Sequence, residues 1–135
     1  MLVAYISLTG NTRRFVEKLD MKSLEINQMQ PEVEVNEDYV FILPTYSDTL
    51  TDIAEQFITY KNNKKYLKGI IGGGEKNFGT KCVFSAKDLS KRLNVPIIFD
   101  FEKSGNNVDV EKFKKEVYRI EITKTKQTNK ENNIL

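Results

Sequence analysis

The sequence predicts an α/β protein in which a parallel sheet is covered by helices on both faces. Two observations support this prediction. Apolar runs that suit buried strands alternate along the chain with segments whose apolar residues recur at helical spacing. Several of these runs are continuously apolar, as in strands that are buried on both faces. The predicted elements are five strands and four helices, joined by right-handed crossovers.

The first segment of the chain is predicted to form a strand, a turn and a helix. Residues 2–6 are apolar and partly β-branched, which favours a buried strand. Phe15, Val16 and Leu19 recur at helical spacing and predict a helix over residues 13–19. The turn between them is rich in hydroxyl groups.

This turn has the chemistry of a phosphate-binding site. It combines backbone N–H groups, the positive end of a helix dipole and three side-chain hydroxyls. Gly10 allows a close backbone approach, and Asn11 tolerates tight turns. The alternative is an ordinary helix start at which Thr9 or Asn11 serves only as the cap. The candidate phosphate contacts are Ser7, Leu8, Thr9, Gly10, Asn11 and Thr12.

The middle of the chain continues the alternation of strands and helices. Residues 23–26 are half polar, which suits an edge strand, and residues 31–38 are acidic and turn-like. Residues 39–43 form the most continuous apolar run, and Pro44 ends it, so we expect a central strand there. Residues 49–60 carry an apolar face at helical spacing.

The next segments complete the predicted sheet. Residues 61–65 are a polar connection, and residues 67–71 are a core strand that runs into a glycine-rich loop at 72–79. A helix is expected over residues 85–93 and a strand over residues 96–101.

The last part of the chain is predicted to contain a turn, a helix and a tail. The turn covers residues 104–107, and the helix covers residues 110–120 with one apolar face. From Thr123 onward the sequence is polar and lacks periodicity. We therefore expect one domain over residues 1–122 and a disordered tail over residues 123–135.

Composition excludes several classes of function. Of the 135 residues, 21 are Lys or Arg and 19 are Asp or Glu, and no basic stripe suggests nucleic acid as a partner. The chain has one cysteine and no histidine, which argues against disulfides, zinc sites and Ser-His-Asp triads. No apolar stretch approaches the roughly 20 residues that span a membrane. We expect a soluble, cytoplasmic protein whose redox chemistry, if any, comes from a cofactor.

The predicted sheet places three loops at one ligand site. In such sheets ligands bind at the carboxyl ends of the strands, here between the first and third strands, where loops 7–12, 44–49 and 72–79 meet. The second and third loops carry Tyr46 and Phe78, which could contact a planar ring. A phosphate and a planar ring together suggest flavin mononucleotide (FMN). Alternatively, Tyr46 is a half-buried surface aromatic and Phe78 a core residue.

A family resemblance extends over the chain up to about Ile120. It is carried by Leu2-Val3-Ala4-Tyr5, Thr9-Gly10-Asn11, Arg14-Phe15, Thr45-Tyr46, Gly74 with Asn77-Phe78-Gly79, Ser85-Ala86, Val95-Pro96-Ile97, Phe101-Glu102-Lys103-Ser104-Gly105 and Asp109-Val110-Glu111. On these residues the chain resembles flavodoxin-like proteins, and more closely the NrdI family of flavoproteins that assist class Ib ribonucleotide reductase.

The resemblance implies a flavodoxin-like, doubly wound, five-stranded parallel sheet of order 2-1-3-4-5 that binds FMN. Besides the phosphate turn, it implies flavin contacts from Thr45, Tyr46, Ser47, Gly73, Gly74, Asn77, Phe78 and Gly79. No residue of the chain is expected to be catalytic itself or to bind a metal. In one departure from the family, the loop after Tyr46 lacks the usual glycines.

The implied activity is the activation of class Ib ribonucleotide reductase. The flavin, reduced by an electron-donating reductase, would react as the hydroquinone with O2. A reduced oxygen species would then reach the dimanganese small subunit and generate its tyrosyl radical. One alternative is a flavodoxin that only carries electrons, although such carriers are usually more acidic. A phosphoacceptor signalling domain of the same fold is disfavoured, because the first and third strands end in Ile6-Ser7 and Leu43-Pro44 rather than in acidic residues.

Overall fold

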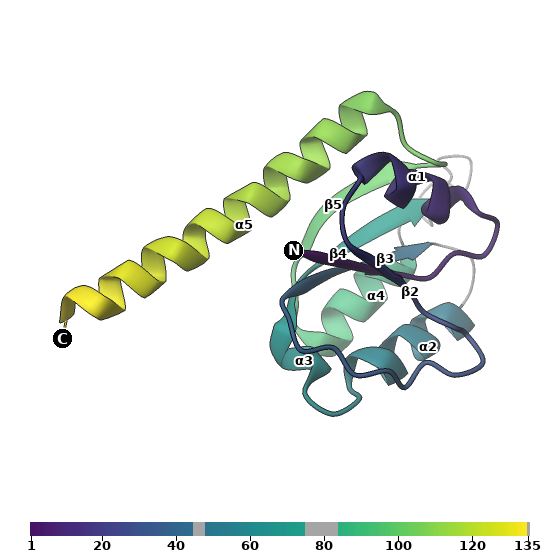
Figure 1. Cartoon of the computed structure of the whole chain (residues 1–135). Coiled ribbons are helices and arrows are strands. Elements are labelled where there is room, and N and C mark those ends of the chain that lie inside the picture. The colour runs from purple at the N-terminus through teal and green to yellow at the C-terminus, as the bar shows by residue number, and fades with distance from the viewer. Residues whose placement is uncertain (45–47, 75–83, 135) are drawn as a thin grey trace.

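The computed structural model describes residues 1–44, 48–74 and 84–134, which form a parallel sheet with helices on both faces (Figure 1). The strands are β1 (Leu2–Tyr5), β2 (Ser23–Glu25), β3 (Tyr39–Pro44), β4 (Leu67–Gly74) and β5 (Ile97–Glu102). The helices are α1 (Asn11–Leu19), α2 (Asp48–Ile58), α3 (Asn63–Tyr66), α4 (Phe84–Leu93) and α5 (Asn107–Ile134).

The sheet has the strand order β2-β1-β3-β4-β5, and every neighbouring pair is parallel. From β1 the chain passes outward to β2 and then returns across β1 to form β3 on its other side. The connections therefore change direction between β1 and β3, which is where ligands bind in doubly wound sheets. This topology confirms the predicted fold class and strand order.

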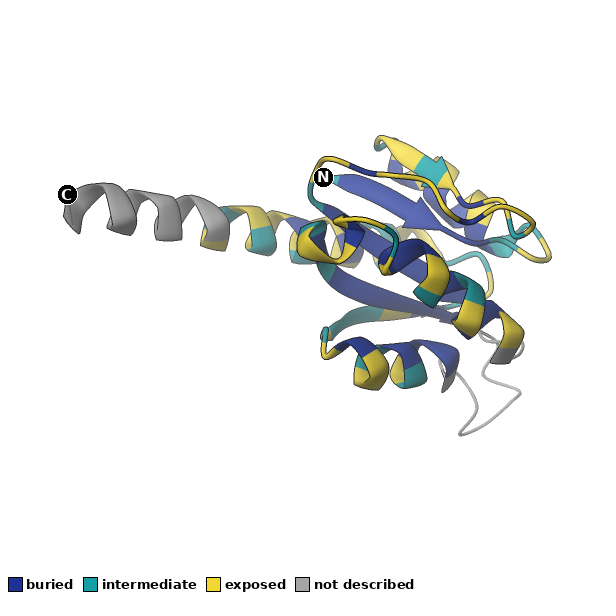
Figure 2. Cartoon of the chain, turned by 90° about the horizontal axis from the view of Figure 1, so that it is seen from below, coloured by how far each residue is buried: buried dark blue, intermediate teal, exposed yellow. Residues whose placement is uncertain are grey.

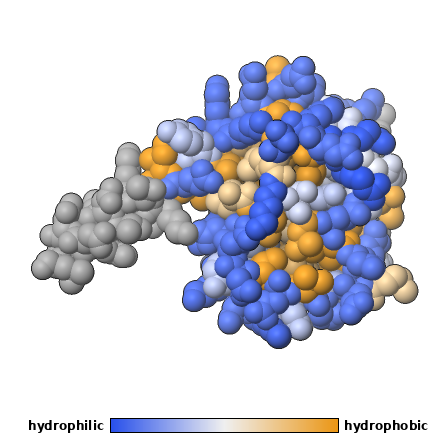
Figure 3. Space-filling model, viewed as in Figure 1, coloured by the Kyte–Doolittle hydropathy of each residue, from blue (hydrophilic) through white to orange (hydrophobic). Residues whose placement is uncertain are grey.

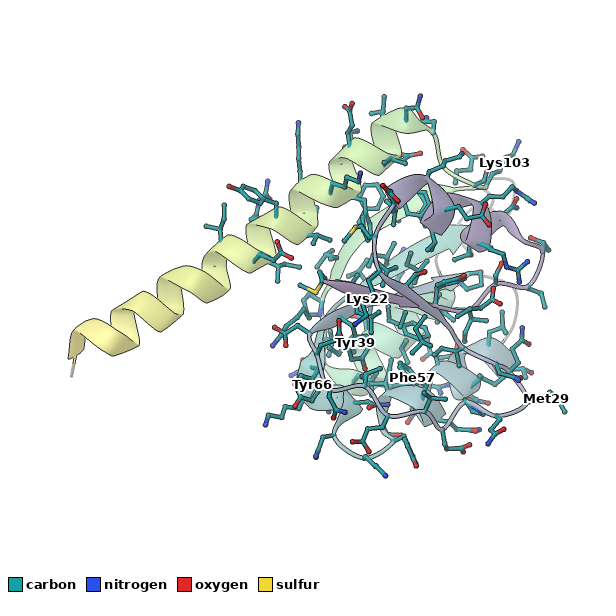
Figure 4. All side chains as sticks on the ribbon, in the orientation of Figure 1. Lys22, Met29, Tyr39, Phe57, Tyr66 and Lys103 are labelled. Atoms are coloured by element: carbon teal, nitrogen blue, oxygen red, sulfur yellow. The ribbon has the colours of Figure 1, made fainter. Side chains whose placement is uncertain are left out.

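Alternate residues of the strands pack into two apolar layers, one on each face of the sheet. Ala4 and Phe41 belong to the layer that α2 and α4 cover, while Val3 and Val40 belong to the layer that α1 and α5 cover. In the first layer Tyr39 and Phe57, both labelled in Figure 4, meet edge to face with ring centroids 5.7 Å apart. Figure 2 shows buried central strands, helices that are buried on their inner side, and a mostly exposed β2 at the edge.

Strand β4 is longer than the sequence predicts and contains glycines that were expected in a loop. Gly72 and Gly73 pair with Leu43 and Pro44 of β3, and Gly73 and Gly74 pair with β5. The predicted start of the loop at residue 72 is therefore wrong. Glycine usually weakens a strand, but here the ring of Phe101 fills the space beside Gly73, where a Cβ would lie 2.9 Å from its Cζ.

A buried asparagine ties the irregular segment after β2 to the helices of the first layer. Asn63 Oδ1 accepts the Val35 N–H at 2.9 Å, and Asn63 Nδ2 donates to the carbonyls of Val33 and Phe57, each at 2.8 Å. This residue begins α3, a short helix that lies partly within the predicted polar connection 61–65. The sequence does not predict this helix, because its one fully buried side chain, that of Asn63, is polar and so gives no apolar pattern.

The last helix begins earlier and ends later than predicted. Asn106 and Asp109 form a reciprocal cap: Asn106 Oδ1 accepts the Asp109 N–H, and Asp109 Oδ2 accepts the Asn106 N–H, each at 2.9 Å. The helix then continues to Ile134 and extends away from the sheet (Figure 1), whereas the sequence predicts disorder after residue 122. Lysine, glutamine and glutamate favour helices without producing apolar periodicity. The domain boundary at residue 122 stays a prediction.

The surface is mostly hydrophilic on the face that Figure 3 shows, with smaller hydrophobic areas between the polar side chains. Within the described ranges, no helix is both long enough and apolar enough to cross a membrane.

Candidate functional site

The turn after β1 lies at the edge of the sheet where the central strands end. Tyr5 at the end of β1 is level with Ile42 of β3, and the Ile6 N–H donates to the Ile42 carbonyl at 3.3 Å. Two residues further along, Pro44 pairs with Gly73 of β4. Residues 7–12 therefore follow β1 at the place where β3 and β4 also end.

The backbone of this turn leaves the start of α1 open. Gly10 is the N-cap residue, with a left-handed φ of 89° that glycine adopts without strain. Glycine has no side chain that could form a cap hydrogen bond, and of the first N–H groups of α1 that of Arg13 is bonded to a side chain, Ser7 Oγ. Gly10, and not Thr9 or Asn11, therefore occupies the N-cap position, and the N–H groups at the start of α1 are donors that a bound anion could satisfy.

The hydroxyl groups of the turn lie in different environments. Ser7 Oγ accepts the Arg13 N–H at 3.3 Å, which joins the beginning of the turn to the first turn of the helix and leaves the Ser7 hydroxyl proton for another acceptor. Thr12 is 4% exposed, whereas Thr9 is exposed. These groups are hydrogen-bond donors, as the oxygens of a phosphate ester require, so the turn fits the phosphate of a flavin nucleotide.

Arg14 is a basic residue at the turn that the sequence reasoning did not assign to the site. Its Nη1 lies 3.1 Å from the position that a Cβ on Gly10 would occupy. Its Nη2 donates to Asn11 Oδ1. The available signal was its spacing, because a residue four positions after the N-cap projects back over it.

Of the candidate site residues in the other two predicted loops, two are described. Gly73 and Gly74 lie in β4, as described above, and their flavin-binding role stays a prediction. The remaining candidates, Thr45, Tyr46, Ser47, Asn77, Phe78 and Gly79, lie outside the described residues.

Aromatic packing fixes α1, and with it the phosphate turn, to the end of β5. Phe15 stacks on Phe101 and meets Phe113 edge to face, with centroids 4.0 Å and 5.7 Å away. Phe15 also touches the turn after β5, where a Cβ on Gly105 would lie 2.6 Å from Phe15 Cδ2. Lys18 Nζ donates to the carbonyls of Ser104 and Gly105 at 3.3 Å and 2.9 Å.

A cavity of about 420 Å³ opens at the end of β5, lined by residues 100–106 and Asp109 (Lys103 is labelled in Figure 4). Its charged lining residues are Asp100, Glu102, Asp109 and Lys103, so carboxylates outnumber the one cation. An acidic lining repels a phosphate, which leaves the turn at α1 as the better phosphate site. Among the described residues, no group of three or more His, Cys, Asp or Glu could hold a metal ion.

Two features together define the class of protein: the sheet order β2-β1-β3-β4-β5 and an open, hydroxyl-rich turn at its switch point. They define a flavodoxin-like protein. A solved structure described as a short-chain flavodoxin associated with a non-canonical PDU bacterial microcompartment is similar in fold. It has a TM-score of 0.61 at 17% identity and covers 90% of this chain and 96% of its own.

The particular family follows from sequence comparison. The family model described as NrdI flavodoxin-like matches residues 3–115. Protein NrdI of Mesoplasma florum is 39% identical over 119 residues, which are 82% of this chain and 79% of that protein. Protein NrdI of Bartonella quintana is 36% identical over 125 residues, which are 89% and 95% of the two chains. The chain belongs to the NrdI flavodoxin-like family, which implies a flavin cofactor and an association with ribonucleotide reductase.

Proposed function

We propose that this protein binds FMN and uses it to activate class Ib ribonucleotide reductase. The observation that carries the proposal is the open N-terminus of α1 at the switch point of the sheet, where Gly10 caps the helix without a side-chain hydrogen bond. Membership in the NrdI family supports the same assignment.

In this proposal the turn 7–12 holds the FMN phosphate. The donors are the backbone N–H groups at the start of α1 and the hydroxyls of Ser7, Thr9 and Thr12. The stack of Phe15 on Phe101 and the hydrogen bonds from Lys18 keep α1 in place against β5, so these donors stay oriented without help from the ligand. Tyr46 and Phe78 are proposed to contact the ring system from the neighbouring loops.

When bound, the flavin would supply the reduction of O2 to the oxidant that the dimanganese small subunit needs for its tyrosyl radical. The chain itself holds and orients the cofactor and presents it to the partner. We place the docking surface at residues 44–48 and 74–81. Lys76 and Lys81 would pair there with acidic residues of the small subunit, which makes association sensitive to salt.

Two measurements test this function. The purified protein should be yellow and release FMN rather than riboflavin on denaturation. Reduced protein, O2 and manganese-loaded small subunit should then give a tyrosyl radical detectable by electron paramagnetic resonance. The matched control replaces this protein by an unrelated reduced flavodoxin at equal flavin concentration. Equal radical yield from that control, or no radical despite full FMN loading, would favour a plain electron carrier.

A further inference from the structure

We propose that Arg14 supplies a positive charge to the phosphate site and gives the turn its selectivity for a flavin that carries a phosphate. The inference rests on the proposed function, because it concerns the same turn. It goes beyond it by assigning the selectivity to one side chain, in addition to the backbone N–H groups and hydroxyls.

The guanidinium of Arg14 is held against the backbone of the turn. Its Nη1 and Cζ lie 3.1 Å and 3.7 Å from the position that a Cβ on Gly10 would occupy. Asn11 Oδ1 accepts a hydrogen bond from Nη2 and so fixes the orientation of the planar group. Glycine at position 10 is favoured by its left-handed φ, and a Cβ there would require the guanidinium to shift slightly.

The positive charge of Arg14 lies beside the N-terminus of α1, where a bound anion would stabilise it. The N-terminus of a helix is the positive end of its dipole, so a cation beside it is unfavourable unless a negative group lies close by. Among the described residues, the hydrogen-bond partner of Arg14 is the neutral amide of Asn11. A phosphate monoester would offset both the cation and the dipole, and a guanidinium can bind it through two parallel N–H groups.

The neighbouring arginine shows the contrast and provides the control. Arg13 is exposed on the same helical turn, but its Nε and Nη2 contact Glu25 Oε1 at 2.8 Å and 2.7 Å. The hydrogen bond to this carboxylate raises the pKa of the Arg13 guanidinium. Arg13→Gln and Arg14→Gln thus remove the same charge from adjacent positions, and only Arg14 lies against Gly10.

The test is a fluorescence titration of apoprotein with FMN and with riboflavin, for the wild type, Arg14→Gln and Arg13→Gln. Arg14→Gln should weaken FMN binding about tenfold and riboflavin binding less than about twofold, because a charge-assisted hydrogen bond is lost only where the phosphate is present. Arg13→Gln should change neither affinity by more than about twofold. Raising the salt concentration should weaken FMN binding more in the wild type than in Arg14→Gln.

The possible outcomes separate this inference from the proposed function. If Arg14→Gln weakened FMN binding and riboflavin binding equally, Arg14 would only stabilise the conformation of the turn. If the FMN affinity were unchanged, Arg14 would play no part in binding. Either result overturns the inference while wild-type FMN binding upholds the proposed function. A wild type that binds neither flavin would overturn both.

Discussion

The ring of Phe15 lies on the ring of Phe101, with centroids 4.0 Å apart and planes inclined by 20°. Phe15 belongs to α1, directly after the phosphate turn, and Phe101 belongs to β5. Each ring occupies space beside a glycine: Gly105 lies against Phe15, and Gly73 lies against Phe101. The packing of these four residues therefore joins α1, which follows the phosphate turn, to β4 and to the edge strand β5.

A methyl group at either glycine should destabilise the fold. Gly73→Ala should cost about 1–3 kcal/mol because its Cβ would overpack the ring of Phe101. Gly105→Ala should cost more, since it also places alanine at a φ of 69°. Urea unfolding of each variant gives the free energies. In the matched control, Lys103→Gly should not lower the free energy of unfolding, because Lys103 itself has a left-handed φ of 55°, which glycine adopts without strain. Wild-type stability in Gly105→Ala would contradict the described packing.

Loss of the Asn63 side chain should destabilise the protein by about 2–4 kcal/mol, because it leaves the Val35 N–H and two carbonyls without their partners. Asn62→Ala is the matched control at the preceding, exposed position, where the side chain makes no cap hydrogen bond. Its free energy of unfolding should change by less than about 0.5 kcal/mol. Equal effects of the two substitutions would argue against a stabilising role of the three hydrogen bonds of the Asn63 side chain.

The buried hydroxyl of Tyr39 should make the protein sensitive to alkaline pH. Desolvation raises the pKa of Tyr39 above its ordinary value, and among the described side chains this hydroxyl has no hydrogen-bond partner. The unfolded chain therefore loses this proton first, so stability falls as pH rises above about 10, the pKa of an unfolded tyrosine. Tyr39→Phe should flatten this loss in unfolding curves measured on both sides of that pH. Tyr118→Phe, at an exposed position, should leave the loss unchanged.

Removal of one hydroxyl from the phosphate turn should weaken FMN binding without disturbing the fold. Thr12→Val keeps the volume of a buried side chain and removes a donor, so FMN affinity should fall about fivefold, corresponding to about 1 kcal/mol, while riboflavin affinity stays the same. Thr51→Val is the control, because the Thr51 hydroxyl is buried and has no hydrogen-bond partner among the described residues. Calorimetric titrations in which Thr12→Val bound FMN as tightly as the wild type would remove Thr12 from the site.

Most of the fold could be predicted because its strands are apolar on both faces. The runs at 2–6 and 39–43 allow few interpretations, and the structure places them at the centre of the sheet. The extension of β4 through Gly72 to Gly74 could not be predicted, since it includes Gly73, which packs against Phe101, a residue distant in the sequence. Likewise, the sequence after Thr123 contains helix-forming residues but no apolar period that indicates a helix.

The candidate site could be predicted in position but only partly in its contacts. The sequence of residues 7–12 indicates a turn before a helix, and the structure places it at the switch point of the sheet. Residue types could not show that Gly10, rather than Thr9 or Asn11, is the cap. The role proposed for Arg14 depends on the direction of a flexible side chain, which residue types alone leave open.

The packing of Phe15 on Phe101 also bears on how this protein can evolve. A larger side chain at position 73 would collide with the ring of Phe101, and one at position 105 would collide with the ring of Phe15. Because the two rings stack on each other, natural selection should remove single substitutions at either glycine. We therefore expect positions 15, 73, 101 and 105 to be inherited as a group among relatives. A homologue that carries a bulky residue at one of the two glycine positions should carry a smaller residue at the facing ring.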